Sequence, residues 1–218
     1  TPELFEASAR AFGRFQYLLS DYPAQTLHES IVNFHNTEDR FAKFEAALAA
    51  DKMGRAKEVE AEVKFAMDRK ADCSVALQAL RDGKLPLRVT HNDTKLNNVL
   101  LDAKTGKAVS VIDLDTVMPG YSVTDFGDSI RAGAASAAED EPDLDKVHFL
   151  PEMFKVYARG FVKGCGGALT EKEISMLPLG GYMLTLETGI RFLTDYLDGD
   201  VYFHTDYADH NLVRARTQ

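Results

Sequence analysis

Residues 88–101 read Arg88-Val-Thr-His-Asn-Asp-Thr-Lys-Leu-Asn-Asn-Val-Leu-Leu101. Between its apolar ends, this stretch carries four polar residues capable of chemistry: His91, Asp93, Lys95 and Asn98. A second apolar run, residues 108–112, ends at Asp113, and Gly106 between the two runs can adopt the positive φ of a hairpin turn. A hairpin would bring Asn98, at the start of one strand, close to Asp113, at the end of the other.

The predicted hairpin places an amide oxygen and a carboxylate together, beside the loop that carries Asp93. Asn98 and Asp113 offer hard oxygen ligands that suit Mg²⁺, an ion that keeps most of its waters and binds few protein groups. Asp93, just outside this pair, is placed to accept a proton from a hydroxyl nucleophile. These are the parts of a phosphoryl-transfer site, so we expect Mg²⁺ at Asn98 and Asp113, with Asp93 as the base.

The spacing of these residues resembles a known motif. His91-Asn-Asp93-x-x-x-x-Asn98 is similar to the catalytic loop of protein-kinase-like enzymes, and Val111-Ile-Asp113 resembles their metal-binding aspartate. The surrounding residues resemble the aminoglycoside phosphotransferase and choline kinase branch more than they resemble protein kinases. Over nearly its full length, the chain resembles the N-acetylhexosamine 1-kinases and their relatives in these blocks: residues 11–16, 26–29, 34–36, 91–95, 113–116, 191–196 and 210–218.

The resemblance implies an α+β, mostly α fold, the large C-terminal lobe of the protein-kinase-like fold, with a small β-hairpin sheet carrying the catalytic loop. It implies an ATP- and Mg²⁺-dependent phosphotransferase that moves the γ-phosphoryl group to a small-molecule hydroxyl, with the anomeric hydroxyl of an N-acetylhexosamine as the expected acceptor. Such kinases begin with a strand-rich lobe carrying a glycine-rich phosphate loop, and no Gly-x-Gly-x-x-Gly occurs here. We therefore expect residues 1–218 to be a single domain, the catalytic lobe without its nucleotide-gripping lobe, and inactive by itself.

Four further residues near the motif need a role. Lys95 could direct its ammonium group at the γ-phosphate, or it could be an ordinary solvent-exposed lysine. We expect His91 to hold the loop from beneath by hydrogen bonding, and Asp115 either to hold a second metal ion or to have a surface or supporting role. Asp125-Phe-Gly127 spells the metal motif of protein kinases, but no strand delivers it. We expect Asp125 to support the catalytic loop from a helix N-terminus, as in the resembling phosphotransferases.

The acceptor site is expected near the C-terminus, where planar polar side chains and an aromatic ring suited to a sugar occur together. Arg191, Asp195 and Tyr202 provide these groups, and the resemblance points to Arg191 and Tyr202 as hexosamine contacts. The alternative is an ordinary ion pair between Arg191 and Asp195, four residues apart on a helix surface. We predict a sugar or amino sugar as the small-molecule partner.

The composition limits the partners and the compartment. The chain has 34 acidic and 25 basic residues, and its net charge of −9 argues against nucleic acid, which binds clustered Lys and Arg. Cys73 and Cys165 lie far apart in the sequence and are expected to be reduced thiols. No apolar run of about 20 residues and no signal peptide occurs, so we expect a cytoplasmic protein that does not enter a membrane.

Helical periodicity covers much of the remaining chain. The apolar spacing predicts helices over residues 2–22, 40–50, 54–80 and 147–162. Thr170 and Glu173 have the spacing of a capping box, in which each residue satisfies a free N–H of the other. A last long helix is expected after Gly181, with an apolar face formed by Leu186, Ile190, Leu193 and Leu197.

Two other functions are compatible with part of the sequence. Asp113-Leu-Asp115-Thr matches the nucleophile motif of haloacid-dehalogenase-like phosphatases, but that motif should open a parallel α/β sheet, and here it follows a hairpin and a largely helical half. A non-enzymatic, catalytically incomplete kinase-like lobe that binds a sugar or a partner is the other alternative. The intact set of Asp93, Asn98 and Asp113 argues against it, because a pure binding module needs no metal site.

Overall fold

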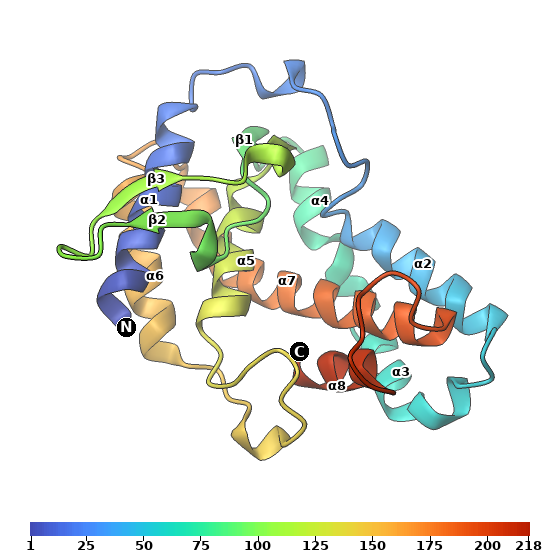
Figure 1. Ribbon diagram of the computed structural model, residues 1–218. Helices are drawn as coiled ribbons and strands as arrows, with labels where there is room; N and C mark the ends of the chain where they lie inside the picture. Colours follow the sequence, from blue (N-terminus) through green and yellow to red (C-terminus); the bar gives the residue numbers. More distant parts are fainter. The chain divides into compact units, whose positions relative to one another are not determined.

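Helices make up most of the computed structural model, which describes the whole chain, Thr1–Gln218 (Figure 1). The α-helices are α1 (Pro2–Leu18), α2 (Thr37–Ala50), α3 (Glu60–Met67), α4 (Val75–Arg81), α5 (Ser122–Gly133), α6 (Pro151–Gly164), α7 (Glu171–Asp198) and α8 (His210–Thr217). The strands are β1 (Arg88–Thr90), β2 (Val99–Leu101), β3 (Ala108–Val111) and β4 (Met118–Gly120). Short 3₁₀ turns are η1 (Ala24–Thr26), η2 (Ala56–Val59), η3 (Lys70–Ser74), η4 (Leu96–Asn98), η5 (Leu114–Thr116) and η6 (Leu144–Lys146). The predicted mostly α, α+β class is confirmed.

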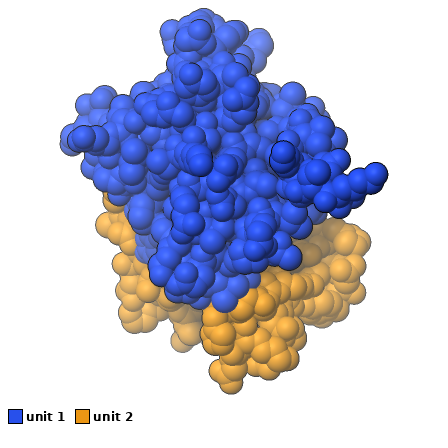
Figure 2. All heavy atoms as spheres, turned by 90° about the vertical axis from the view of Figure 1, so that its left-hand side faces the viewer, with its two compact units in different colours: residues 1–34, 79–135, 149–184 blue, residues 35–78, 136–148, 185–218 orange.

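Contacts divide the chain into two units, which Figure 2 colours separately. Unit 1 comprises Thr1–Phe34, Ala79–Ala135 and Phe149–Leu184, and unit 2 comprises His35–Gln78, Ser136–His148 and Thr185–Gln218. The loop at residues 91–98 and the predicted hairpin therefore belong to unit 1. The predicted acceptor residues belong to unit 2.

The core of unit 1 is built mainly from aromatic side chains. Helices α1 and α6 lie side by side, and the β2–β3 hairpin lies against α1 (Figure 1). The Phe126 ring of α5 lies 5.6 Å from the Tyr157 ring and 5.5 Å from the Phe161 ring, both on α6. Burial of this apolar area is the main force that holds the three helices around the hairpin. The buried cluster comprises Phe5, Ala9, Phe12, Val99, Phe126, Ile130, Ala134, Tyr157, Phe161, Cys165, Leu169 and Leu177.

Unit 2 has a separate apolar core. The predicted inward face of the last long helix is confirmed, because Leu186, Ile190, Leu193 and Leu197 are all buried there. They pack with residues of α2, η2, α3, η3 and α8: Phe41, Phe44, Ala47, Val59, Ala66, Cys73 and Leu212.

The predicted hairpin is present and sets the geometry around the loop. Strands β2 and β3 pair antiparallel, with Val99 opposite Val111 and Leu100 opposite Ser110. The turn contains Gly106 at φ 66°, and the Asp102 carboxylate accepts a hydrogen bond from the Thr105 N–H at 2.7 Å. A second antiparallel pair joins β1 to β4. Both sheets are two-stranded, so no parallel sheet accompanies Asp113.

The predicted long helix over residues 54–80 is wrong, because this stretch forms η2, α3, η3 and α4 instead. Between residues 54 and 74, only Val59, Ala66 and Cys73 are buried. A stretch with so few buried apolar residues lacks the continuous apolar face that stabilises a long helix. The helix predicted at residue 147 begins later, at Pro151, because proline favours the first helical turn.

Helix α7 begins at Glu171, before Gly180 and Gly181, so the predicted start after these two glycines is wrong. The capping box that starts it is confirmed, since the Glu173 N–H donates to Thr170 Oγ1 at 3.1 Å and the Thr170 N–H donates to Glu173 Oε2 at 2.8 Å. A Cβ atom at Gly180 would lie 2.2 Å from the Val123 carbonyl oxygen. This glycine therefore allows α7 to approach α5 closely and does not end the helix.

None of the helices combines the length and the apolar character that crossing a membrane requires.

Candidate active site

The Asp93 carboxylate is the centre of a group of polar side chains on the loop after β1. Its Oδ2 atom lies 2.7 Å from Lys95 Nζ and 2.8 Å from Asn98 Nδ2. The same Asn98 amide also donates to the main-chain carbonyl of Asp93 at 2.8 Å. The structure thus brings together the three side chains that the sequence predicted at the loop.

Asp113 adjoins this group because the hairpin places it there. The Ile112 N–H donates to the Asn98 main-chain oxygen at 2.9 Å, so the residue after Ile112 leaves the hairpin beside Asn98. Asp113 itself adopts a left-handed conformation at φ 63°, which aspartate tolerates better than most residues. The pKa of Lys95 is raised, first by the hydrogen bond to Asp93 and further by the charges of Asp93, Asp113 and Asp128.

Two oxygen groups at this position are available to a metal ion. Asn98 turns its amide nitrogen toward Asp93, and its Oδ1 atom accepts no hydrogen bond. The exposed Asp113 carboxylate takes part in no hydrogen bond or ion pair. One amide oxygen and one carboxylate fit Mg²⁺, which completes its shell with water and phosphate oxygens. The structure contains no group of three or more His, Cys, Asp or Glu side chains suited to a metal.

His91 connects the loop to the hairpin from a fully buried position. Its Nδ1 atom accepts a hydrogen bond from the Asp93 N–H at 3.3 Å, so Nε2 carries the proton and donates to the Ile112 carbonyl at 2.9 Å. The ring also lies against the rings of Phe12 and Phe15 on α1, with centroid distances of 5.2 and 5.8 Å. Because both ring nitrogens bond the main chain, His91 holds the Asp93 loop and the Ile112 end of the hairpin at a defined separation.

Asp125 holds the start of the loop from the first turn of α5. Its carboxylate, fully buried, accepts hydrogen bonds from the His91 N–H at 2.9 Å, the Asn92 N–H at 2.8 Å and the Gln16 side-chain amide at 2.8 Å. Burial raises the pKa of Asp125, while these three donors stabilise its charged form and oppose that shift. Asn92, which has φ 65°, is held further by its side-chain bond to the Thr116 carbonyl at 2.9 Å.

Thr94, which the sequence did not single out, is also held by α5. Its N–H donates to Asp128 Oδ2 at 2.8 Å, and its hydroxyl donates to the Asp125 carbonyl at 2.5 Å. The Ser129 hydroxyl donates to the Thr94 carbonyl. Residues 125, 128 and 129 share one face of a helix, so the spacing of Asp125, Asp128 and Ser129 was the sequence signal for this support.

Asp115 lies beyond this group, on an exposed turn. Its main-chain carbonyl accepts a hydrogen bond from Ser30 Oγ at 3.1 Å, and its carboxylate makes no ion pair. A second metal ion at Asp115 stays a prediction.

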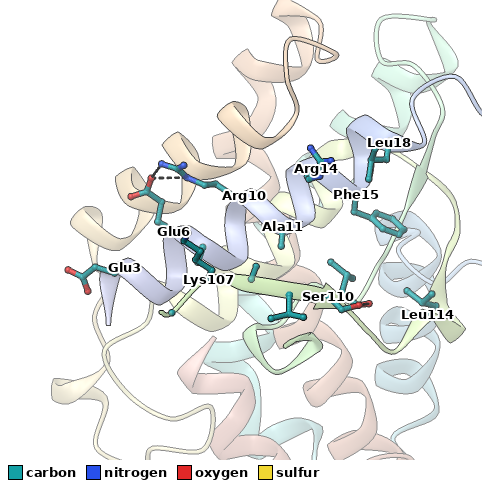
Figure 3. A pocket seen from close by; sticks show the side chains of 15 residues that line it. Glu3, Glu6, Arg10, Ala11, Arg14, Phe15, Leu18, Lys107, Ser110 and Leu114 are labelled. Atoms are coloured by element: carbon teal, nitrogen blue, oxygen red, sulfur yellow. Dashed lines mark hydrogen bonds and ion pairs between the residues drawn. The ribbon is translucent and has the colours of Figure 1, made fainter. Parts of the chain in front are cut away.

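A groove of about 740 Å³ opens in unit 1 between α1 and β3 (Figure 3). Its lining is mainly apolar and includes Phe15, Leu18 and Leu114, which lie toward one end of the groove in Figure 3. At its rim, Arg10 pairs with Glu6 at 2.5 Å. The groove ends at Leu114, directly after Asp113 in the chain, and its volume is in the range of small-molecule sites.

The three predicted acceptor residues lie together in unit 2. Asp195 accepts hydrogen bonds from the N–H groups of Val201, Tyr202 and Phe203 at 3.0, 2.8 and 3.0 Å, and from the Asn211 side-chain amide at 2.9 Å. Its oxygens therefore hold the loop at residues 200–203, and no ion pair joins Asp195 to Arg191.

Arg191 is placed beside the aromatic residues of that loop. Its guanidinium carbon lies 5.3 Å from the Phe203 ring centre and 6.0 Å from the Tyr202 ring centre. Burial lowers the pKa of Arg191, and the positive charge of Arg40 lowers it further. Tyr202 remains 72% exposed, so the loop presents an aromatic face to solvent above a planar cation. A direct contact of these residues with a substrate stays a prediction.

Comparison with known families bears on this arrangement. The family model described as "Phosphotransferase enzyme family" (APH) matches residues 3–157. The match covers well over half of the chain and includes the 91–98 loop, the hairpin and α5. This chain belongs to the APH phosphotransferase family, a branch of the protein-kinase-like superfamily.

Proposed function

We propose that this protein transfers the γ-phosphoryl group of ATP to a hydroxyl of a small molecule. The observation that carries the proposal is the contact of one Asp93 oxygen with both Lys95 and Asn98, beside the free oxygens of Asn98 and Asp113. This arrangement combines a proton acceptor, a cation and two metal-ligand groups within one loop and hairpin, as phosphoryl transfer requires.

Asp93 orients the acceptor hydroxyl and takes its proton as the bond to phosphorus forms. In the structure, the ammonium group of Lys95 occupies one oxygen of the Asp93 carboxylate. Lys95 has an exposed side chain that can turn toward a phosphate. We propose that Lys95 leaves Asp93 when the donor binds, which frees the carboxylate for the acceptor and places the ammonium where negative charge develops.

Asn98 Oδ1 and the Asp113 carboxylate would hold Mg²⁺, which neutralises the charge of the phosphate oxygens when bound. The Asn98 nitrogen keeps Asp93 in place at the same time. Asn98 therefore sets the separation between the base and the metal-ligand groups. Asp125 and His91, both buried, keep the loop from moving while the substrates change their contacts.

The acceptor we propose is the anomeric hydroxyl of an N-acetylhexosamine. The resembling sequence blocks support it, and so does the group in unit 2, where Arg191 lies beside Tyr202 and Phe203. A sugar ring can stack on an aromatic face while its hydroxyls bind a planar guanidinium. Asp195 would contribute by holding the Tyr202 loop, through the three main-chain hydrogen bonds described above.

The fold does not favour the phosphatase alternative, because the strand before Asp113 belongs to a two-stranded antiparallel hairpin.

To test the proposal, the full-length gene product is incubated with ATP, Mg²⁺ and a panel of N-acetylhexosamines, hexoses, amino alcohols and aminoglycosides. We expect ADP release that depends on an N-acetylhexosamine and a sugar 1-phosphate detected by ³¹P NMR. Release of ADP without any acceptor, and equal release by an Asp93→Asn variant, would refute it. Sugar binding without turnover would favour the binding-module alternative.

A further inference from the structure

A chain of buried hydroxyl groups runs from α6 to the loop that carries Asp93. The Tyr157 hydroxyl lies 2.5 Å from Ser129 Oγ, and Ser129 Oγ bonds the Thr94 carbonyl. Tyr157 and Thr94 are fully buried, and Ser129 is 2% exposed. Water therefore does not replace any of these partners, and each hydroxyl depends on the next one.

The direction of the protons along this chain follows from its end point. A carbonyl oxygen can only accept, so the single proton of Ser129 points at Thr94. Ser129 Oγ can then only accept from its other partner, and Tyr157 is the donor. Burial raises the pKa of Tyr157 well above its usual range, so this hydroxyl keeps its proton. The order is therefore Tyr157 to Ser129 to Thr94.

The position of Tyr157 is set by the apolar core. Its ring centre lies 4.6 Å from that of Phe5 and 5.6 Å from that of Phe126. A phenylalanine would fill the same space without placing a polar atom in the core, where an unpaired hydroxyl is unfavourable. The bond to Ser129 is the one hydrogen bond that the structure records for this hydroxyl.

The Thr94 carbonyl, where this series of hydroxyl groups ends, affects the geometry of the Asp93 loop. The Thr94 carbonyl belongs to the same planar peptide unit as the Lys95 N–H. Other bonds hold Thr94 from α5 alone, through Asp128 and the Asp125 carbonyl. The hydroxyl chain adds a connection from α6 and fixes the peptide plane from which Lys95 extends to Asp93.

We propose that Tyr157 and Ser129 are positioning residues: through the Thr94 carbonyl they hold Lys95 and Asp93 in register for phosphoryl transfer. The kinetic part of this inference rests on the proposed function, and the structural part does not. Neither residue touches a reacting group, so both act through the loop.

The structural part is tested by amide hydrogen exchange of the full-length protein, followed by mass spectrometry of peptides covering residues 91–98. Tyr157→Phe removes one oxygen atom from the chain, and we expect faster exchange in these peptides. Ser122→Ala is the matched control: it removes a buried hydroxyl on the same helix, which donates to Glu173 at 2.8 Å and not to the loop. Unchanged exchange at residues 91–98 in Tyr157→Phe, or an equal increase in Ser122→Ala, would overturn the proposal.

The kinetic part uses Tyr157→Phe, Ser129→Ala and the double variant. We expect kcat to fall on the order of tenfold in each single variant, with KM for donor and acceptor within about twofold, because orientation is lost and not binding. The double variant should be no slower than Ser129→Ala, because both changes interrupt the same series of hydrogen bonds from Tyr157 through Ser129 to Thr94. An unchanged kcat in Tyr157→Phe would refute the positioning role. Absence of transfer by the wild type would refute the proposed function, and the exchange experiment would still decide the structural part.

Discussion

Asn98 donates both hydrogen bonds of its side-chain amide to Asp93, one to the carboxylate and one to the main-chain carbonyl, each at 2.8 Å. This contact joins Asn98, the residue directly before β2, to Asp93 in the loop after β1. Because the Asn98 side-chain nitrogen makes both of these bonds, the side-chain oxygen is the atom that remains for a cation. The Asn98 side chain therefore fixes the position of the base and also provides one ligand of the metal site that we propose.

Asp93→Asn should abolish most of the turnover while leaving the fold intact. The amide cannot accept the proton of the acceptor hydroxyl, so we expect kcat to fall about 10²–10⁴-fold. Steady-state kinetics and a thermal melt measure the two effects. Asp21→Asn, a change at an exposed carboxylate of unit 1, is the control. Wild-type activity in Asp93→Asn would remove this residue from the mechanism.

Asp113→Ala should raise the Mg²⁺ concentration needed for half-maximal activity, on the order of tenfold or more, because one of two proposed ligands is lost. The measurement is a Mg²⁺ titration at saturating ATP. Asp115→Ala, tested in parallel, distinguishes the two acids of this turn. An equal shift in both variants would indicate a second ion at Asp115, and no shift in Asp113→Ala would rule out that residue as a ligand.

Glu173→Gln should destabilise the protein at neutral pH and change its response to acid. Arg88 binds Glu173 through two nitrogens, at 2.5 and 2.7 Å, and Glu173 is fully buried. Burial alone raises the pKa of Glu173, but the bonds from Arg88, the Thr170 N–H and Ser122 outweigh it, and the pKa is lowered below 4.5. Removing one partner of a buried pair costs about 3–5 kcal/mol.

The sign of the pH effect follows from this lowered pKa. The unfolded chain binds the proton first as the pH falls below about 4.5, so the stability that Glu173 contributes is present above that value and is lost below it. Urea unfolding at pH 7, 5 and 3.5 should therefore show a smaller acid loss in Glu173→Gln than in the wild type. Glu6→Gln, at the exposed pair with Arg10, should change stability by under about 1 kcal/mol. Equal effects of the two variants would contradict the prediction.

Neither cysteine should react with iodoacetamide in the folded protein at pH 8. Burial raises the pKa of Cys73 to about 11 and that of Cys165 to about 12, so almost no thiolate is present. Intact-mass measurement should show no adduct in buffer and two adducts in urea. Rapid labelling of the native protein would show that the thiols are accessible, contrary to the structure.

Asp195→Ala should weaken acceptor binding more than it slows the chemical step. The change removes three main-chain hydrogen bonds from the loop that presents Tyr202, so that loop becomes more mobile. We expect KM for the acceptor to rise on the order of tenfold, with KM for ATP unchanged. The control is Asp198→Ala, a change on the same helix as Asp195 that breaks the exposed ion pair between Asp198 and Lys52. An equal rise in both KM values would contradict an acceptor role for this loop.

The local pattern of the sequence predicted several features correctly. The turn at Gly106 and the two apolar runs predicted the β2–β3 hairpin, and the Ile112 N–H bond to Asn98 confirms that it brings the neighbour of Asp113 beside Asn98. The Thr170 and Glu173 spacing predicted a capping box. Both depend on residues within a short stretch of chain, so neighbouring positions contain the necessary information.

Other features were wrong or missed because they depend on distant residues. Helix α7 continues through Gly180, which local propensity treats as a helix end, since Val123 of α5 packs against the glycine. The stretch from residue 54 to 80 breaks into shorter elements because its burial is set by the core of unit 2. The bond between Tyr157 and Ser129 joins residues 28 positions apart.

By itself, the sequence determined the mostly α class, the hairpin and the identity of the polar residues on it, because periodicity and turn chemistry act between neighbours. The resemblance already pointed to Asp125 as a support of the Asp93 loop, and Asp125 does accept hydrogen bonds from its main chain. Only the tertiary structure decided that Asp128 and Ser129 of α5, and Tyr157 of α6 through Ser129, hold the loop as well by buried hydrogen bonds. Buried polar groups must find partners, and which partners they find depends on how α5 and α6 pack, a relation that no short stretch of sequence contains.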